Sequence, residues 1–385
     1  MTKRKICVVI TARPSYSRIR TALKAIKDHP ELELQLVVAA SALLDRYGST
    51  VNYIEKDGFE ITEKVYMVIE GASLTTSAKT TGIGIMELST TFDNLKPDMV
   101  CTIGDRYETV ATAIAASYMN IPLVHIQGGE VTGNIDEKVR HAISKLSDLH
   151  LVSNDDARQR LIKMGEYEDK IFITGCPSID IAREVMENPA MDFDPCEKYG
   201  GVGKYIDPKK DYLVVMQHPV TTEHTKAKQQ AAALLEAVYK LDMPTFWFWP
   251  NPDAGSDATS SVLRTFREEH AENNFRFFKN MEGHDFLKLL LHSKCLVGNS
   301  SVGIRECSYL GVPVVNIGSR QNRRLRGHNV VDTDYSTSNI FEAVQKQVRH
   351  KLYPVDTVYG DGTAAEKIAD VIAKAQPDIR KVISY

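Results

Sequence analysis

Two apolar runs in the first third of the chain each end in a cluster of polar residues, and a predicted helix follows each cluster. The run Met99 to Ile103 is short and partly β-branched, and Thr109 to Met119 then carries Ala and Val at helical spacing. The second run, Ile121 to Ile126, leads through a glycine-rich turn into a helix that begins near Asp136. Two consecutive strand–helix units predict adjacent parallel strands. Ligands bind at the carboxyl ends of such strands, where both polar clusters then lie.

The same alternation extends through the first half of the chain. Ile6 to Thr11 predicts a buried strand, which a polar turn connects to a helix from about Arg18 to Lys27. No sequence repeat of roughly 20 to 50 residues is present, which favours a wound sheet over a solenoid. The other expected strands are Leu34 to Ala40, Lys64 to Val68, Leu149 to Ser153 and Lys170 to Thr174, and the other expected helices are Val51 to Lys56 and Ile83 to Leu95.

A second strand–helix series follows a segment of changed composition. Residues Asn188 to Asp211 are rich in proline, glycine and charge, so we place the domain transition there or just before it. The sequence therefore predicts an α/β fold with two wound domains that face each other across a cleft. The later expected strands are Tyr212 to Met216, Thr245 to Trp249, Phe275 to Phe278, Lys294 to Val297 and Pro313 to Ile317, and the helices are Lys226 to Leu241, Ser260 to His270, Phe286 to His292, Val302 to Leu310, Ile340 to His350 and Ala364 to Ala375.

Length, charge and cysteine usage limit the class of protein. A chain of 385 residues suits two domains of roughly 200 residues each. The net charge of −3 is spread along the chain, which argues against a nucleic-acid partner. No window approaches 18 apolar residues, and the basic start leads into a strand, so neither a membrane span nor a secretory segment is expected. The six cysteines form no CxxC pair, which indicates buried free thiols and a reducing, cytoplasmic compartment.

The first polar cluster contains Asp105 and Arg106. Asp105, with Glu108 three residues later, fits a helix capping box, which is a structural role. At a ligand cleft, Asp105 also offers a carboxylate to a substrate and Arg106 a guanidinium to its phosphate. The two roles are compatible, because a capping residue at the cleft is still exposed to it.

The second cluster follows the next strand and includes Glu130, Asp136 and Arg140. Asp136 and Arg140 are four residues apart and share one face of the predicted helix. Alone, such a pair is usually a surface ion pair worth ~0.3 to 0.5 kcal/mol. Its position beside another strand-end cluster favours a functional site.

The second domain offers an anion site and a histidine. Ser300 and Ser301 stand between a strand and a helix expected from Val302, where free N–H groups and hydroxyls favour an anion, although helix capping is the ordinary role of such residues. Glu306 lies one turn further on and suits a ribose diol, and Arg320 directly follows the next strand. His218 ends the first strand of this domain, and a lone histidine is more often structural than catalytic.

Metal and nucleotide-cofactor motifs are missing from the sequence. The eleven histidines show no HExxH spacing, and no Walker-type GxxxxGK is present. The glycine motif that begins at Gly82 does not follow a strand. We therefore expect no metal and no cofactor.

Taken together, eight segments resemble the hydrolysing UDP-N-acetylglucosamine 2-epimerases of sialic-acid and related nonulosonate synthesis, including the epimerase half of the animal bifunctional enzyme. The resemblance runs nearly end to end, and its strength lies in the order of the motifs. The segments are RPSYS (13–17), GDRYE (104–108), HIQGGEVTGNIDEKVRHAISKL (125–146), GCPS (175–178), QHPVTT (217–222), PNPDAGS (250–256), GNSSVGIRE (298–306) and YGDG (359–362).

The resemblance implies a GT-B-like fold, in which two Rossmann-like domains with parallel sheets, residues 1–180 and 181–363, face a central cleft that holds the nucleotide sugar. A C-terminal helix at about 364–380 then packs back on the first domain, and the protein forms a homodimer or homotetramer. The resemblance places Asp105, Asp136, Arg140 and His218 around the sugar. It assigns to the nucleotide and its diphosphate Arg13, Ser17, Arg106, Asn251, Asp253, Ser300, Ser301, Glu306 and Arg320.

One position departs from the family pattern. Many relatives carry a proton-transferring Glu directly after the His-Ile pair, whereas this chain has Gln127, which cannot exchange a proton near neutral pH. Glu130 in the same loop is the expected replacement, and Gln127 is left with hydrogen bonding. His125 matches the family, but Ile103 stands where the animal enzyme has His.

The implied reaction converts UDP-N-acetylglucosamine to N-acetylmannosamine and UDP through 2-acetamidoglucal, with Asp105 and Asp136 as the acid/base carboxylates. The nearest alternative applies the same chemistry to UDP- or GDP-2,4-diacetamido-2,4,6-trideoxyglucose on the legionaminic-acid route. Alternatives of another class are a GT-B glycosyltransferase and a nucleotide-sugar sensor without turnover, the latter suggested by Gln127.

Overall fold

The computed structural model of the chain describes residues 2–45, 49–70, 74–104, 106–131, 135–250, 255–270 and 272–385. These residues form two compact units. Unit 1 contains the chain up to Val131, residues Ile135–Asp180 and the C-terminal residues Gly360–Tyr385, and unit 2 contains Ile181–Tyr359. The C-terminal segment therefore belongs to the same unit as the N-terminus.

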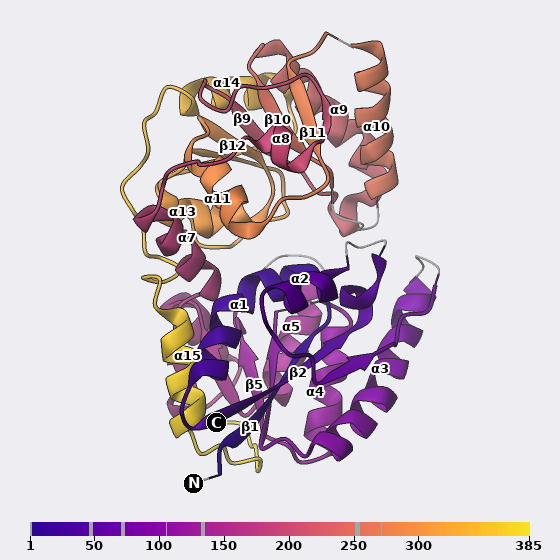
Figure 1. Ribbon diagram of the computed structural model, residues 1–385, viewed down its shortest axis with the longest axis vertical. Helices are drawn as coiled ribbons and strands as arrows, with labels where there is room; N and C mark the ends of the chain where they lie inside the picture. The colour runs from indigo at the N-terminus through magenta and orange to yellow at the C-terminus, as the bar shows by residue number, and fades with distance from the viewer. Residues whose placement is uncertain are drawn as a thin grey trace. The chain divides into compact units, whose positions relative to one another are not determined.

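Unit 1 is built on a sheet whose seven described strands are all parallel, in the order β3-β2-β1-β4-β5-β6-β7. Figure 1 labels β1, β2 and β5 of this sheet. The order reverses between β1 and β4, and in such sheets ligands bind beside this reversal. The strands are β1 Arg4–Ile10, β2 Leu32–Ala39, β3 Glu63–Val65, β4 Met99–Ile103, β5 Leu123–Ile126, β6 Leu149–Val152 and β7 Ile171–Ile173. The helices are α1 Arg13–Asp28, α2 Thr50–Lys56, α3 Leu74–Leu95, α4 Thr109–Tyr118, α5 Ile135–Leu146, α6 Asp155–Lys163, the start of α7 Pro177–Glu187, and α15 Ala364–Lys374.

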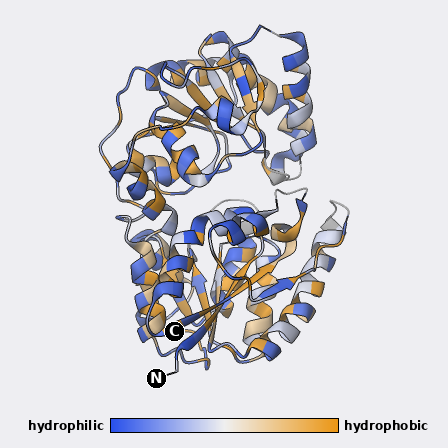
Figure 2. Cartoon of the chain, viewed as in Figure 1, coloured by the Kyte–Doolittle hydropathy of each residue, from blue (hydrophilic) through white to orange (hydrophobic). Residues whose placement is uncertain are grey.

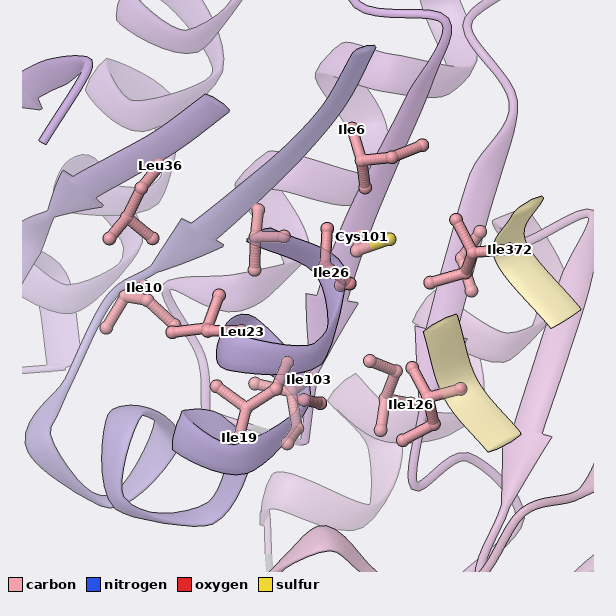
Figure 3. Packing of buried hydrophobic residues seen from close by; sticks show 14 of the residues in the cluster. Ile6, Ile10, Ile19, Leu23, Ile26, Leu36, Cys101, Ile103, Ile126 and Ile372 are labelled. Carbon is pink, nitrogen blue, oxygen red and sulfur yellow. The ribbon is translucent and has the colours of Figure 1, made fainter. Parts of the chain in front are cut away.

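Both faces of the unit 1 sheet are covered, which explains why its strands are continuous apolar runs. Ile6 and Ile10 of β1 pack on one face with residues of α1 and α15, and Figure 3 shows these side chains together with Cys101 and Ile372. Val9 of the same strand packs on the other face, against residues of α3 and α4. Figure 2 shows hydrophobic residues concentrated along the strands.

Helix α15 is fixed to unit 1 at both ends. The carboxylate of Asp180 accepts hydrogen bonds from the backbone N–H groups of Ala364 at 2.9 Å and Ala365 at 2.8 Å. At the other end, Nη1 of Arg4 donates to the carbonyls of Ile372 at 2.7 Å and Ala375 at 2.8 Å. These contacts satisfy backbone groups that a helix end leaves open.

Replacing Ile372 by Ala is expected to lower the free energy of unfolding of unit 1 by about 2 to 5 kcal/mol, because the side chain is fully buried in the core and its removal leaves a cavity. Urea unfolding followed by circular dichroism measures the change. Ile173→Ala is the matched control, since Ile173 is 48% exposed. If both variants lose the same free energy of unfolding, α15 is not part of the stable core.

Unit 2 has a second wound sheet in the order β14-β13-β12-β9-β10-β11-β8, parallel except for the β8–β11 pair. Its order reverses between β9 and β12. The strands are β8 Val202–Gly203, β9 Leu213–Met216, β10 Thr245–Phe248, β11 Phe275–Phe278, β12 Cys295–Gly298, β13 Val314–Ile317 and β14 Val330–Thr333. The helices are α8 Pro195–Tyr199, α9 Ala227–Lys240, α10 Ser256–Glu269, α11 Gly283–Leu291, α12 Ser301–Ile304, α13 Glu306–Leu310 and α14 Thr337–Gln347, with a 3-10 helix, η4 Thr221–Lys226, before α9.

The sequence-based prediction needs correction at several elements. The helix expected over Val302 to Leu310 is broken at Arg305 into α12 and α13. The C-terminal helix expected to about residue 380 ends at Lys374, because Pro377 disfavours helical backbone in the residue before it. Elements that we did not expect include α6, α7, α8, β8 and β14. The last two are a two-residue strand and a partly exposed edge strand, so neither forms a buried apolar run.

Two further predictions concerned the state of the cysteines and the presence of a membrane-spanning helix. All six thiols are buried and free, as the sequence predicted. No helix in the described ranges is long and apolar enough to cross a bilayer.

Candidate active site

In unit 1, the residues that follow the parallel strands collect at the carboxyl edge of the sheet. The loop after β5, Gln127–Val131, lies between the loops after β4 and β6, because these strands are neighbours in the sheet. This edge therefore brings Arg106, from the first predicted cluster, to the same side of the sheet as Gln127 and Glu130, from the second.

His125 connects the ends of β4 and β5. Its Nε2 is 3.0 Å from the carbonyl oxygen of Gly104, and its Nδ1 is 3.1 Å from the hydroxyl of Ser144 on α5. A carbonyl only accepts, so Nε2 carries the proton and the Ser144 hydroxyl donates to Nδ1. A Cβ at Gly128 would lie 2.8 Å from Nδ1, so this close approach requires glycine. The ring thereby fixes the carbonyl of the residue that precedes Asp105.

The folded protein is expected to lose stability as the pH falls below about 6.5. Burial lowers the pKa of His125 to about 3, so the ring stays neutral in the folded state, whereas the unfolded chain takes up a proton below pH 6.5. The contribution of the neutral ring is therefore complete above pH 6.5 and is lost progressively between pH 6.5 and 3. Between pH 7 and pH 5 this amounts to about 2 kcal/mol.

The variant His125→Gln keeps a donor for Gly104 but does not titrate. Its loss of unfolding free energy between pH 7 and 5, measured by urea titration, should be smaller than that of the wild-type protein by about 2 kcal/mol. His328→Gln is the control, because the His328 side chain is 89% exposed. A pH dependence of His125→Gln identical to wild type would contradict the neutral assignment.

Gln127 is held in a buried and unusual conformation. Its backbone has φ of 65°, in the left-handed region, and its side chain is only 2% exposed. The amide Nε2 donates to Sγ of Cys176 at 2.8 Å, and that sulfur lies 3.0 Å from the hydroxyl of Ser178. The side chain therefore links the loop after β5 with the loop after β7.

Glu130 and Arg140 lie together in the buried part of this edge. The hydroxyl of Ser153 donates to Oε1 of Glu130 at 2.8 Å, and Nη1 of Arg140 donates to the backbone carbonyl of Glu130 at 3.1 Å. Glu130 is 6% exposed and Arg140 is 2% exposed. The ordinary alternative for Arg140 was a surface ion pair on α5, but the guanidinium is buried, and its contact with Glu130 ties α5 to the loop after β5.

Arg106 is directed toward Glu108. Its Nε donates to Oε1 of the buried Glu108 carboxylate at 2.8 Å. The capping box expected from Asp105 and Glu108 is wrong, because α4 begins only at Thr109 and the Glu108 side chain makes no capping hydrogen bond. Elsewhere on this side of unit 1, the guanidinium of Arg13 lies 4.8 Å from the ring centre of Tyr53, and Ser17 is exposed on α1. Arg106 keeps 29% of its side chain exposed, which leaves part of its charge accessible to a ligand.

Unit 2 has a comparable edge where β9, β12 and β13 end. Asn299 is fully buried there and bonds the backbone of His218 twice, accepting from its N–H and donating to its carbonyl, each at 2.8 Å. Gly298 has φ of 138°, and a Cβ at this position would overlap the carbonyl oxygen of Met216. The sequence gives no signal for this role of Asn299, because nothing in the spacing shows that it joins two strand ends.

Arg320 lies next to this junction. Its Nη1 donates to the carbonyl of Asn299 at 3.3 Å, and Gln321 donates to the same oxygen at 2.8 Å. Burial and then the charge of Arg320 lower the pKa of His218 to about 3. Without a bound anion, His218 is therefore neutral and can orient a ligand by hydrogen bonding, but it contributes no positive charge.

The serine turn is present, but the helix after it is short. Ser300 caps α12, and the hydroxyl of Ser301 accepts a hydrogen bond from Arg305 at 2.9 Å. Since α12 spans only four residues, few peptide dipoles add up, and anion binding at this turn must depend on Arg320 and the hydroxyls. Glu306 begins α13, and its Oε2 is buried, with no hydrogen-bond partner among the described residues, 3.9 Å from Nε of Arg305.

Four predicted site residues cannot be placed fully. Asp105, Asn251 and Asp253 lie outside the described residues. Asp136 belongs to α5, whose backbone is described, but its side chain is not.

A sequence model of the UDP-N-acetylglucosamine 2-epimerase family matches residues 24–373. The chain belongs to this epimerase family. It is 34% identical over 365 residues to the UDP-N,N'-diacetylbacillosamine 2-epimerase (hydrolyzing) of Legionella pneumophila, which covers 94% of each chain. It is also 34% identical over 373 residues to a UDP-N-acetylglucosamine 2-epimerase of Neisseria meningitidis serogroup B, which covers 96% of this chain and 95% of the relative.

Solved epimerase structures share the fold. The UDP-GlcNAc 2-epimerase of Neisseria meningitidis, in a crystal structure bound to UDP-GlcNAc, superimposes with a TM-score of 0.81 at 18% identity, over 96% of this chain and all of that chain. The family and the GT-B-like fold class predicted from the sequence are both confirmed.

Proposed function

We propose that this epimerase converts UDP-N-acetylglucosamine to N-acetylmannosamine and UDP. The observation that carries the proposal is the pair of strand-end clusters. Unit 1 gathers the Glu130 carboxylate and Arg140, and unit 2 gathers Arg320, two serine hydroxyls and the Glu306 carboxylate. The first set suits proton transfer on a sugar, and the second suits a nucleoside diphosphate.

Inversion at C2 of the hexose requires two acid/base groups. The C2 hydrogen leaves one face of the ring, and a proton arrives on the other face. This hydrogen is not adjacent to a carbonyl and is only weakly acidic, so the C1–O bond to the diphosphate must break ahead of proton removal. The product of this elimination is 2-acetamidoglucal, and addition of water gives the free sugar. Two carboxyl groups with different surroundings can divide these tasks.

Asp105 and Asp136 are the proposed acid/base pair. Asp105 directly follows Gly104, whose carbonyl is fixed by His125, and Asp136 lies in the first turn of the helix that carries Arg140. Gln127 donates its amide to Cys176, so its carbonyl oxygen is left to accept from the sugar. Glu130 takes over the proton transfer that Gln127 cannot perform. Its burial and its hydrogen bond from Ser153 hold one carboxylate oxygen in place.

Stabilisation of the leaving diphosphate is the task of unit 2. A guanidinium forms short, charge-assisted hydrogen bonds with phosphate, and Arg320 is the proposed main donor. The hydroxyls of Ser300 and Ser301 add donors, and Glu306 accepts from the ribose hydroxyls. From unit 1, Arg13, Ser17 and Arg106 are the further proposed contacts to the nucleotide.

A substrate panel tests the proposal. The protein is incubated with UDP-N-acetylglucosamine, UDP-2,4-diacetamido-2,4,6-trideoxyglucose and the GDP form of the latter, and the products are identified by NMR. Free N-acetylmannosamine and UDP from the first substrate support the proposal. UDP-N-acetylmannosamine would show that the nucleotide is retained, and binding of all three without products would favour a sensor.

The diacetamido sugar is the second candidate substrate. The Legionella relative, which is named for a diacetamido sugar, is as similar to this chain as the Neisseria relative named for UDP-N-acetylglucosamine. If only the diacetamido substrate is consumed, the proposed reaction type is correct and the assignment of UDP-N-acetylglucosamine as the substrate is wrong.

A further inference from the structure

The last eleven residues of the chain follow α15 and are attached to unit 1. The backbone N–H of Ser384 donates to the carbonyl of Gly165 at 3.1 Å. Nζ of Lys381 donates to the backbone carbonyls of Ser144 at 3.1 Å and Ser147 at 2.6 Å, and lies 2.5 Å from Oε2 of Glu166. The Lys381 side chain is 22% exposed. Four contacts thus hold a segment that is otherwise irregular.

Glu166 is the buried anion that receives this lysine. Its side chain is 2% exposed, with Nζ of Lys145 at 2.7 Å and Nε2 of His150 at 2.9 Å. Burial by itself raises the pKa of Glu166, but the hydrogen bonds from His150, Lys145 and Lys381 outweigh it and lower the pKa to about 2. The carboxylate is therefore ionised, and a buried anion depends on its cationic partners.

The two carbonyls bound by Lys381 belong to the C-terminal end of α5. Helix α5 ends at Leu146, where carbonyls have few N–H partners further along the chain, and that of Ser144 accepts only a long hydrogen bond of 3.3 Å from the N–H of Ser147. A positive charge at this end also interacts favourably with the helix dipole. Lys381 therefore acts as a C-terminal cap that comes from a distant part of the sequence.

Two residues of helix α5, Arg140 and Ser144, form hydrogen bonds with residues of the candidate active site. Arg140 donates to the carbonyl of Glu130. Ser144, whose carbonyl accepts from Lys381, uses its hydroxyl to hold the ring of His125, and His125 donates to the carbonyl of Gly104. A continuous series of hydrogen bonds thus leads from the C-terminal segment to the loops after β4 and β5.

We propose that Lys381 is a positioning residue for catalysis, which fixes α5 and thereby the loops after β4 and β5. The proposal rests on the function proposed above. Without the lysine, Glu166 keeps Lys145 and His150, so the fold survives, but the end of α5 loses its cap. The helix can then shift along its axis, and Arg140 and Ser144 shift with it. Displacement of catalytic groups by about 1 Å is enough to lower a rate about a hundred-fold.

The test compares Lys381→Met, Lys381→Arg and the control Lys374→Met, in which an exposed lysine paired with Asp370 is lost. We expect Lys381→Met to lower kcat about ten- to a hundred-fold with KM nearly unchanged, because the nucleotide is held by other groups. Lys381→Arg retains the charge and should recover most of kcat. Lys374→Met should behave as wild type.

Hydrogen exchange measured by mass spectrometry supplies a readout that does not require turnover. In Lys381→Met, the amides of residues 106–109 and 125–131 should exchange faster than in wild type, in addition to those at the end of α5. Faster exchange with no turnover in any variant would support the positioning and contradict the proposed reaction. Unchanged exchange in these loops together with unchanged kcat would overturn the positioning proposal, even if the melting temperature falls.

Discussion

Replacement of Asp105 by Asn is expected to lower kcat roughly a thousand-fold while the affinity for UDP stays nearly unchanged. Asparagine has almost the same shape as aspartate but cannot exchange a proton, and the residue acts on the sugar rather than on the nucleotide. Asp136→Asn should behave in the same way, because inversion at C2 needs a proton-transfer group on each face of the ring. Steady-state release of UDP and calorimetric titration with UDP measure the two quantities.

The control for these variants is Asp169→Asn, since the side chain of Asp169 is 71% exposed and forms an ion pair with its neighbour Lys170. It should keep the wild-type kcat. A loss of UDP binding in both Asp105→Asn and Asp136→Asn would show that these residues bind the nucleotide, and their assignment to proton transfer would then be wrong.

Replacement of Arg320 by Met should lower kcat about a hundred- to a thousand-fold and also weaken binding of UDP. The guanidinium lies at the carboxyl end of β13 beside Asn299 and His218, where the diphosphate is proposed to bind. Its charge stabilises the leaving group most strongly in the transition state, when the C1–O bond is breaking. The same kinetic and calorimetric measurements apply.

Arg323→Met is the matched control, because Arg323 is exposed in the same loop. It should retain both UDP affinity and turnover. If the two arginine variants lose activity to the same extent, the loop contributes only a general positive charge, and the specific role of Arg320 is refuted.

The parts of the fold that sequence predicted best are the buried parallel strands. In β1, β4 and β5 every second side chain packs on each covered face of the sheet, so each strand is an unbroken apolar run with polar residues directly after it. The positions of the polar clusters around Gln127 and Ser300 could be predicted, because each cluster directly follows such a strand. The hydrogen-bond partners of these residues could not be predicted in this way.

Contacts between distant segments were not predictable from spacing. Asn299 bonds the backbone of His218, 81 residues away, and Lys381 caps a helix that ends 235 positions earlier, at Leu146. In each case the side chain is an ordinary polar residue in its own segment, and only the folded chain supplies its partner. The break at Arg305 was not predicted either, although the contact found there is local: the buried guanidinium donates to Ser301, four residues before it.

The most direct test of the account is the fate of the C2 hydrogen. The protein is incubated with UDP-N-acetylglucosamine in deuterated water, and the released sugar is analysed by NMR, with N-acetylmannosamine alone as the control for exchange after release. We predict free N-acetylmannosamine that carries deuterium at C2, together with UDP. A released sugar that retains its original hydrogen at C2 would contradict elimination and re-addition at this carbon, and with it the role given to the carboxyl groups of unit 1.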